Sequence, residues 1–405
     1  MAVRPCPRDA IPAAYNRGMS DLASQRPTRI RVDLDALAHN LAGIRRHTGR
    51  PVMGIVKANA YGHGLVPVAR HLEARGIDQL GVAFVEEGIA LRRAGIRTPI
   101  LVMGGVYGKQ LQDFITHDLE ITVSSIDKLR LAESAAALAG RQAVIHLKID
   151  TGMERVGVHS YSCQGLIDAA FASRGCRVKG VYSHLACADD PAHPMTPVQI
   201  ARFAEACDHV ERACARAGVA MPIRHLANSG GVLHFPDSWL DLVRPGLALY
   251  GALPDPASRD PIGLAPVLSL TSRVVYFKVV RAGATVSYGA TWTAANDTRI
   301  VTIPIGYGDG WPRSLSSTGE VLIRGLRKPI VGRVCMDQFM VDLGPQGTAY
   351  NEDEVVLVGT QGVEKLRVEA VAASAGTIPY EILTGLNERI PREYVGGSLS
   401  MGDSA

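Results

Sequence analysis

Short apolar segments that alternate with helix patterns dominate the first two thirds of the chain. Helical stretches with apolar residues at three- and four-residue spacing separate them, as in 33–48 with Leu34, Leu37, Leu41 and Ile44. Eight strands that alternate with helices are the count of a (β/α)8 barrel. We therefore predict an α/β protein with an N-terminal (β/α)8, TIM-like barrel. The predicted strands are 51–56, 80–84, 99–103, 119–123, 143–149, 178–183, 223–227 and 242–243.

Polar residues gather where these predicted strands end. In a (β/α)8 barrel the loops after the strands build the active site, so side chains at the strand ends are expected to face one another. The sequence therefore predicts one polar site at a single end of the barrel. The residues at these positions are Lys57, Ser124, Asp150 with Arg155, His184, Ser229 and Arg244.

After about residue 262 the pattern changes. Gly, Pro and Asn-Asp turns, rather than helices, now separate the β-rich segments. We predict a disordered N-terminal extension at 1–27, a barrel domain at 28–255, an all-β domain at 256–395 and a tail at 396–405, with 251–260 as the hinge. The strands predicted in the second domain are 267–270, 271–280, 285–288, 299–305, 321–324, 340–343 and 354–358.

Composition and charge exclude several functions. The 405 residues carry a formal charge of +4 without a basic block, which argues against nucleic acid. No apolar run reaches the roughly 20 residues of a membrane span. Seven scattered cysteines without a CxxC motif argue against disulfides and a structural metal site, so no metal is expected. Residues 1–27 lack the apolar core of a secretory signal, and either Met1 or Met19 could be the start. We predict a cytoplasmic protein.

Lys57 ends the first predicted strand and begins the Gly-rich turn 57–64. A lone lysine at a strand end is more often an ordinary surface residue. If it is buried, however, its amine loses hydration, its pKa falls, and it becomes usable as a nucleophile or a base.

A phosphate site is predicted after the last two strands, where barrels often bind phosphate. Ser229-Gly230-Gly231 follows the seventh strand and Gly246-Leu247 follows the eighth. Each taken alone is more often an ordinary loop, but together they favour a phosphorylated ligand. With Lys57 at the first strand end, they indicate pyridoxal phosphate bound to a lysine as a Schiff base.

Arg244 narrows the class of reaction that such a cofactor would support. A guanidinium only donates hydrogen bonds and keeps its charge, so beside the pyridine nitrogen it would disfavour a protonated ring. The cofactor would then be a weak electron sink, which suits a reaction that removes and returns one proton. His184 could orient Arg244, although an isolated histidine there is more often a satisfied core residue.

Nine motifs, spread over both predicted domains, resemble those of one known family. In this order, and over about residues 28–395, the chain resembles the alanine racemase family, whose members use pyridoxal phosphate. The motifs are VKANAYGHG, KIDTGMERVG, SHLACADD, RHLANSGG, LVRPGLALYG, VSYGATW, IGYGDGWPR, GRVCMDQFMVDL and PYEILTGLNERIPR.

The resemblance implies a homodimer that racemises L- and D-alanine and supplies D-alanine for peptidoglycan. It implies Lys57 as the Schiff-base lysine and one catalytic base, and Tyr288 of the second subunit as the base on the opposite face, because inversion needs an acid or base on each face. A nearby cation such as Arg155 would lower the pKa of a phenol such as Tyr288. By the same resemblance Arg155 and the Met336 amide bind the substrate carboxylate, and Lys148 is a candidate for N6-carboxylation.

The resemblance also assigns the rest of the site. It implies that the cofactor phosphate is bound by Tyr61, Ser229, Gly246, Leu247 and Tyr380. The substrate entrance, supplied by the partner subunit, falls to Tyr307, Met336 and Asp337. One departure is Glu154, an acid beside Arg155 that could soften its pull on the substrate.

Three alternatives stay open. A racemase of broader scope could act on serine or larger amino acids. A decarboxylase of the same architecture would want a carboxylate in place of Arg244. A non-catalytic pyridoxal-phosphate carrier would need neither the second domain nor Tyr288. The substrate ranking and the choice between biosynthesis and catabolism are not encoded in any of these motifs.

Overall fold

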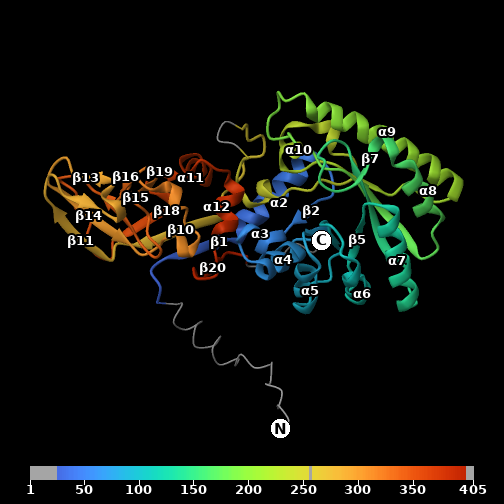
Figure 1. Ribbon diagram of the computed structural model, residues 1–405, viewed down its shortest axis with the longest axis horizontal. Helices are drawn as coiled ribbons and strands as arrows, with labels where there is room; N and C mark the ends of the chain where they lie inside the picture. Colours follow the sequence, from blue (N-terminus) through green and yellow to red (C-terminus); the bar gives the residue numbers. More distant parts are fainter. Residues whose placement is uncertain (1–24, 255–257, 398–405) are drawn as a thin grey trace, which may run out of the picture. The chain divides into compact units, whose positions relative to one another are not determined.

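The computed structural model describes residues 25–254 and 258–397, which form two compact units (Figure 1). The barrel unit contains Asp33–Val267, Ile378–Thr384 and the described residues from Tyr394 onward. The β unit contains the described residues up to Val32, Leu268–Thr377 and Gly385–Glu393. Most of the predicted N-terminal extension, including Met19, and most of the predicted tail lie outside the described residues.

Seven parallel strands in the order β2-β3-β4-β5-β6-β8-β9 build the barrel, and the short β7 pairs with β6. All four residues of β3 and of β5 are buried, as expected for strands covered on both faces. The fold class predicted from the sequence is confirmed. The strands are β2 Met53–Ile55, β3 Gln79–Val82, β4 Ile100–Val102, β5 Glu120–Val123, β6 Ala143–Asp150, β7 Val158–His159, β8 Cys176–Tyr182 and β9 Ile223–His225.

The predicted eighth strand is reduced to a single bridge. Val243 forms one parallel bridge with Val52, and its N–H donates to Pro51 O over 3.0 Å. On the other side the Arg244 N–H donates to Ala227 O, also over 3.0 Å. Two residues are too few for a regular strand, but these bonds join the segment after β9 to β2 and close the barrel.

Along the chain, helices alternate with the barrel strands (Figure 1). The helix predicted from residue 33 begins at Leu34 because Asp33 is its N-cap, whose carboxylate accepts from Ala36 N over 2.9 Å. Among the described residues no helix is both long and apolar enough to cross a bilayer. The main helices are α2 Leu34–Thr48, α4 Leu65–Ala74, α5 Val85–Arg93, α6 Leu111–Thr116, α7 Ile126–Ala139, α8 Gln164–Ala172, α9 Met195–Ala217 and α10 Ser229–His234.

The β unit is built on one sheet in the order β11-β14-β17-β16-β15-β18-β10-β1-β20, with β19 beside β18 and a separate β12-β13 pair. Its strands are β1 Arg29–Asp33, β10 Leu268–Arg273, β11 Tyr276–Val280, β12 Thr285–Val286, β13 Trp292–Thr293, β14 Thr298–Ile303, β15 Glu320–Ile323, β16 Leu326–Val331, β17 Phe339–Asp342, β18 Glu354–Gln361, β19 Glu364–Leu366 and β20 Arg392–Val395. Two helices, α11 Val368–Ala375 and α12 Pro379–Gly385, follow β19.

The strand pattern of the β unit differs from the prediction, which lacked β1, β13, β16, β19 and β20 and merged two strands into one. Residues 29–33 were assigned to the barrel domain and no strand was predicted for them, but they form β1, which pairs antiparallel with β10, with Arg29 opposite Thr271. The single strand expected over 271–280 is two strands, because β10 pairs with β18 whereas β11 pairs with β14. β16 was not predicted, and it contains Pro329, a residue that normally argues against a strand.

Candidate active site

Lys57 lies directly after β2 and opens a left-handed turn. Ala58, Asn59, Ala60 and Tyr61 all have φ between 52° and 54°. L-residues normally enter this region singly, at about 1–2 kcal/mol each, so four in succession are a concentrated strain. The turn is held locally by the Ala58 N–H, which donates to Glu87 Oε1 over 2.6 Å. Asn59 Oδ1 accepts from Leu65 N over 2.7 Å.

The left-handed turn buries Tyr61 among aromatic rings. The ring of Tyr61 lies 5.1 Å from that of Tyr250 and 6.1 Å from that of Tyr380. Burial raises the pKa of the Tyr61 hydroxyl well above its usual range, so it remains a hydrogen-bond donor. The hydroxyl faces Gly246, where an added Cβ would collide with it. Segment Ile378–Thr384 therefore brings Tyr380 next to Tyr61.

The predicted phosphate residues come together around Ser229. Its Oγ accepts from Gly246 N over 3.0 Å and from Ala248 N over 3.1 Å, and Leu247 between them is fully buried. At Gly230 a Cβ would lie 2.5 Å from the carbonyl oxygen of Ala188. The hydroxyls of Ser229 and Tyr61, both potential donors, thus lie next to Gly246. Such a group of donors suits a phosphate.

Arg244 is buried, with 2% of its surface exposed, and its guanidinium contacts two backbone carbonyls and two histidine rings. Nη2 donates to Ser183 O over 2.7 Å and to Leu226 O over 3.1 Å. Nη1 donates to His225 Nδ1 over 3.1 Å, and His184 Nδ1 lies 3.4 Å from Nη2. Within residues 25–254 and 258–397, Nε has no hydrogen-bond partner. A buried N–H without a partner is costly, and the pyridine nitrogen of pyridoxal phosphate is an acceptor that would satisfy it. The residues therefore fit this cofactor.

Cations crowd the mouth of the barrel and shift the pKa values of their neighbours. Burial, and then the charge of Arg155, lower the pKa of the Lys57 amine. Burial and then Arg244 hold the pKa of Lys148 well below its ordinary value. The Lys148 amine lies 4.5 Å from the ring centroid of Tyr182. Burial and then Lys148 also hold the pKa of His184 well below its usual range. Two amines near Arg244 are thus biased toward the neutral, reactive form.

The loop after β6 presents Arg155. The Asp150 carboxylate organises this loop, since Oδ1 accepts from Gly152 N over 2.8 Å and Oδ2 from Arg155 N over 3.2 Å. The Arg155 side chain is exposed. The carboxylate of the neighbouring Glu154 lies 2.8 Å from His159 Nε2.

The remaining predicted residues lie in the β unit. Tyr288, 71% exposed, begins a 3-10 turn (Tyr288–Ala290) rather than ending a strand, because Ser287 before it has φ 69°. Tyr307 and Met336 are also exposed, and their loops are joined by the Gly308 N–H, which donates to Met336 O over 2.8 Å. The β unit thus displays these side chains on its surface.

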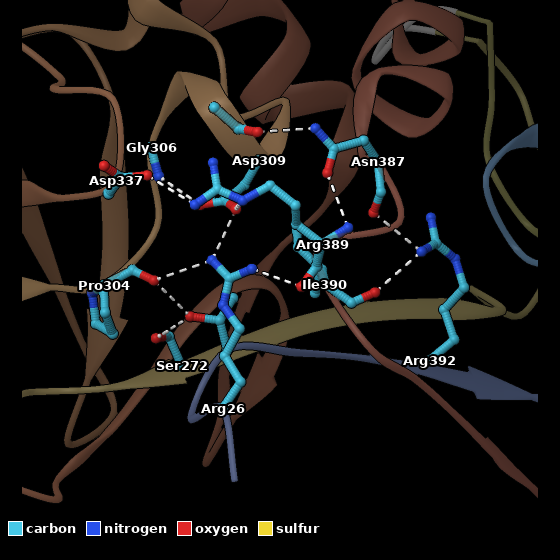
Figure 2. A network of polar contacts seen from close by, with 12 residues as sticks. Arg26, Ser272, Pro304, Gly306, Asp309, Asp337, Asn387, Arg389, Ile390 and Arg392 are labelled. Atoms are coloured by element: carbon cyan, nitrogen blue, oxygen red, sulfur yellow. Dashed lines mark hydrogen bonds and ion pairs between the residues drawn. The ribbon is translucent and has the colours of Figure 1, made fainter. Parts of the chain in front are cut away.

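A polar network supports the loops of Tyr307 and Asp337 (Figure 2). Asp309 is fully buried, lies 2.8 Å from Arg26 Nη2 and 3.3 Å from Arg389 Nε, and accepts from Gly306 N over 3.1 Å. Arg389 also pairs with Asp337 Oδ1 over 2.7 Å. Arg389 therefore links the loop around Asp309 to Asp337.

Three residues of the site's surroundings were not singled out in the sequence. His225, His146 and Glu120 form a buried chain behind Arg244. Glu120 begins β5, His146 lies within β6 and His225 ends β9. A lone polar residue in a barrel strand is usually a satisfied core residue. The available signal was their recurrence in strands β5, β6 and β9 of one barrel.

Fold and site together define a class: a barrel enzyme suited to pyridoxal phosphate. Lys57 can react with the cofactor's aldehyde, the donors around Ser229 suit its phosphate, and Arg244 Nε suits its ring nitrogen.

Comparison with known proteins then gives the family. The model of the alanine racemase N-terminal domain matches residues 32–254, and that of the C-terminal domain matches 267–394. The chain belongs to the alanine racemase family, which confirms the resemblance inferred from the motifs.

Individual relatives agree over nearly the whole length. The alanine racemase of Desulforamulus reducens is 41% identical over 380 residues, covering 92% of this chain and 100% of the relative. The crystal structure of alanine racemase from D-cycloserine-producing Streptomyces lavendulae gives a TM-score of 0.87 at 38% identity, covering 92% of this chain and 98% of that one. A Bartonella henselae alanine racemase solved with covalently bound pyridoxal phosphate gives 0.81 at 30% identity, covering 91% and 99%.

Proposed function

We propose that the chain is a pyridoxal-phosphate-dependent racemase that interconverts L- and D-alanine and supplies D-alanine for peptidoglycan. The observation that carries the proposal is the buried Arg244 Nε, which has no hydrogen-bond partner among the described residues, together with the donors around Ser229. Arg244 bonds to two carbonyls and faces two histidines, with no carboxylate among its partners in the described chain. This favours racemisation over decarboxylation, which profits from a protonated ring.

The cofactor would be held at three points. Lys57 Nζ would bind it covalently, Arg244 with His184 beside it would face its ring, and the phosphate would lie among the donors around Ser229. When bound, pyridoxal phosphate withdraws electrons from the amino acid and so loosens its α-proton. The phosphate-binding residues of the proposal are Tyr61, Ser229, Gly246, Leu247 and Tyr380.

Two bases would exchange this proton. Lys57, whose pKa is lowered by burial and by Arg155, would take or return a proton at Nζ on one face. Tyr288 would act on the opposite face, from the second subunit of a homodimer. Its 71% exposure on the β unit supports this, since a catalytic phenol facing solvent in one chain can be covered by another.

The substrate's carboxylate would be bound by the exposed Arg155 guanidinium, whose planar fork suits a carboxylate, and by the Met336 amide. Tyr307 and Asp337 would shape the entrance from the partner subunit. The pairing of Asp337 with Arg389 supports a fixed entrance.

Lys148 would be carboxylated on its amine. An amine reacts with carbon dioxide only when neutral, and the strongly lowered pKa of Lys148 favours that form. The product is an anion that would offset the neighbouring charges of Arg244 and Arg155. Intact-mass measurement at neutral pH should show one added carbon dioxide, absent in Lys148→Met.

We place this activity in the cytoplasm. All six cysteines of the described residues are free, which suits a reducing compartment.

Two variants and a substrate panel test the proposal. Lys57→Ala should lose the visible absorbance of the lysine-bound cofactor, and Tyr288→Phe should lose racemisation while the cofactor stays bound. Full activity in either variant would refute the assignment. A chiral assay of the purified protein should show turnover of alanine. Equal turnover of serine would indicate the broader racemase, and cofactor binding without turnover would indicate the carrier. Sedimentation tests the dimer.

A further inference from the structure

A buried chain of hydrogen bonds runs from Arg244 through the barrel to Glu120. We propose that Glu120 and His146 are positioning residues that fix the proton positions on two histidines and thereby hold Arg244 in place. The inference rests on the proposed function, because it concerns how Arg244 is presented to the cofactor ring.

The chain has three links between four buried side chains. Arg244 Nη1 lies 3.1 Å from His225 Nδ1. His225 Nε2 lies 2.9 Å from His146 Nδ1, and His146 Nε2 lies 2.7 Å from Glu120 Oε2. Both histidines are fully buried, and Glu120 is 6% exposed. Lys179 pairs with the other oxygen of Glu120.

The two ends of the chain require the same proton positions. A guanidinium can only donate, so His225 Nδ1 must accept, which places the ring proton on Nε2. His225 Nε2 then donates to His146 Nδ1, so the proton of His146 is also on Nε2 and is donated to Glu120. A carboxylate can only accept, so Glu120 demands the same arrangement from its end. If the ring proton of either histidine moved from Nε2 to Nδ1, the His225 Nδ1–H would face the Arg244 guanidinium, which can only donate.

The electrostatics keep this arrangement stable. Burial lowers the pKa of His146 and, together with Arg244, holds that of His225 well below its usual range, and both shifts favour neutral rings. Burial alone would raise the pKa of Glu120, but the bond from His146 and the charge of Lys179 outweigh it and lower the pKa. These shifts favour a charged Glu120 that accepts from a neutral His146.

The backbone makes room for the chain. A Cβ at Gly180 would lie 2.6 Å from His146 Cε1 and still closer to Nδ1, the atom that bonds to His225. The pairing of β6 with β8 also shifts register between Ile145 and His146, a bulge of the kind that re-aims side chains. Both features lie at His146, where it contacts His225.

The experiment combines nitrogen-15 NMR of labelled histidines with kinetics on the holoenzyme. The wild type should show His146 and His225 neutral, with the proton on Nε2. Glu120→Leu removes the acceptor, so His225 should lose this single form, and kcat for alanine should fall about tenfold with little change in KM. Glu120→Gln keeps an oxygen that can accept from His146 and should restore the wild-type form.

Gln79→Met is the matched control. Gln79 Nε2 donates to the same carboxylate oxygen over 2.6 Å but stands outside the chain, so the proton positions and kcat should stay those of the wild type. The proposal is overturned if the wild-type spectrum shows either histidine protonated on Nδ1, a result that needs no variant to fold. It also fails if Gln79→Met reproduces the effect of Glu120→Leu. A wild type without racemase activity but with the expected spectrum would refute the proposed function and still support the proposed series of hydrogen bonds from Arg244 to Glu120.

Discussion

Gly246→Ala tests whether the close approach of Gly246 to Tyr61 shapes the cofactor site. The new Cβ would lie 2.9 Å from Tyr61 Cζ and closer to the hydroxyl oxygen, whereas ordinary contacts begin at 3.4 Å. The ring, packed against Tyr250 and Tyr380, would have to retreat by on the order of 1 Å. Overpacking of this kind costs about 1–3 kcal/mol.

The same displacement would remove the Tyr61 hydroxyl from the cofactor phosphate. A hydrogen bond to a charged group contributes about 1.5–3 kcal/mol, so affinity for pyridoxal phosphate should fall about 10- to 100-fold. Titration of the apoprotein with pyridoxal phosphate, followed by fluorescence, measures this loss. Gly105→Ala is the control, because its Cβ would meet no atom within 4 Å.

A double-mutant cycle provides the refutation. In a Tyr61→Phe background the colliding oxygen is gone, so Gly246→Ala should cost less affinity than in the wild type, with a coupling of at least about 1 kcal/mol. Equal losses in the two backgrounds would show that Tyr61 is not the reason for a glycine at 246.

Three further predictions concern the strained turn and the lysines. Asn59→Ala should lower the free energy of unfolding in urea by about 1–2 kcal/mol, since it removes both a left-handed-tolerant residue and the acceptor for Leu65 N; Asn59→Asp should not, and equal losses would contradict this. Arg155→Gln removes a cation that lowers the pKa of Lys57, so the pH midpoint for its reaction with pyridoxal phosphate should rise; an unmoved or lower midpoint would count against the contact. Because the folded pKa of Lys148 lies well below 10.5, the folded state binds fewer protons between the two values and stability rises with pH there. Lys148→Met should flatten this rise in urea titrations in carbon-dioxide-free buffer, and an unchanged slope would refute it.

The barrel could be predicted because its strands and helices carry strong local periodicity. The helix at 33–48 and the strand at 143–149 needed only the spacing of their apolar residues. β1 could not be assigned in this way, because its five residues show no sign of a partner near residue 271. The turn of Tyr288 depends on the left-handed backbone of Ser287, which is not a common conformation for serine.

The candidate site also contains residues that the sequence could indicate and residues that it could not. Residues in contiguous motifs, such as Lys57 and Ser229, could be named because strand ends of a barrel converge on one face. The chain behind Arg244 could not, since its links depend on which side chains face inward at the same level in β5, β6 and β9. A register shift at His146 decides that level, and no local pattern announces it.

The pairing of β1 with β10 and the place of β20 beside β1 have a consequence for how the protein is made. β1 leaves the ribosome before any residue of the barrel, yet its two neighbours are synthesised about 235 and 360 residues later. At roughly 5–20 residues per second, β1 waits on the order of 20–70 s for its second partner. The barrel strands can pair during that time, so the first strand of the chain is among the last to be placed. Until β20 arrives, β1 has a free edge that chaperones or a second nascent chain could occupy.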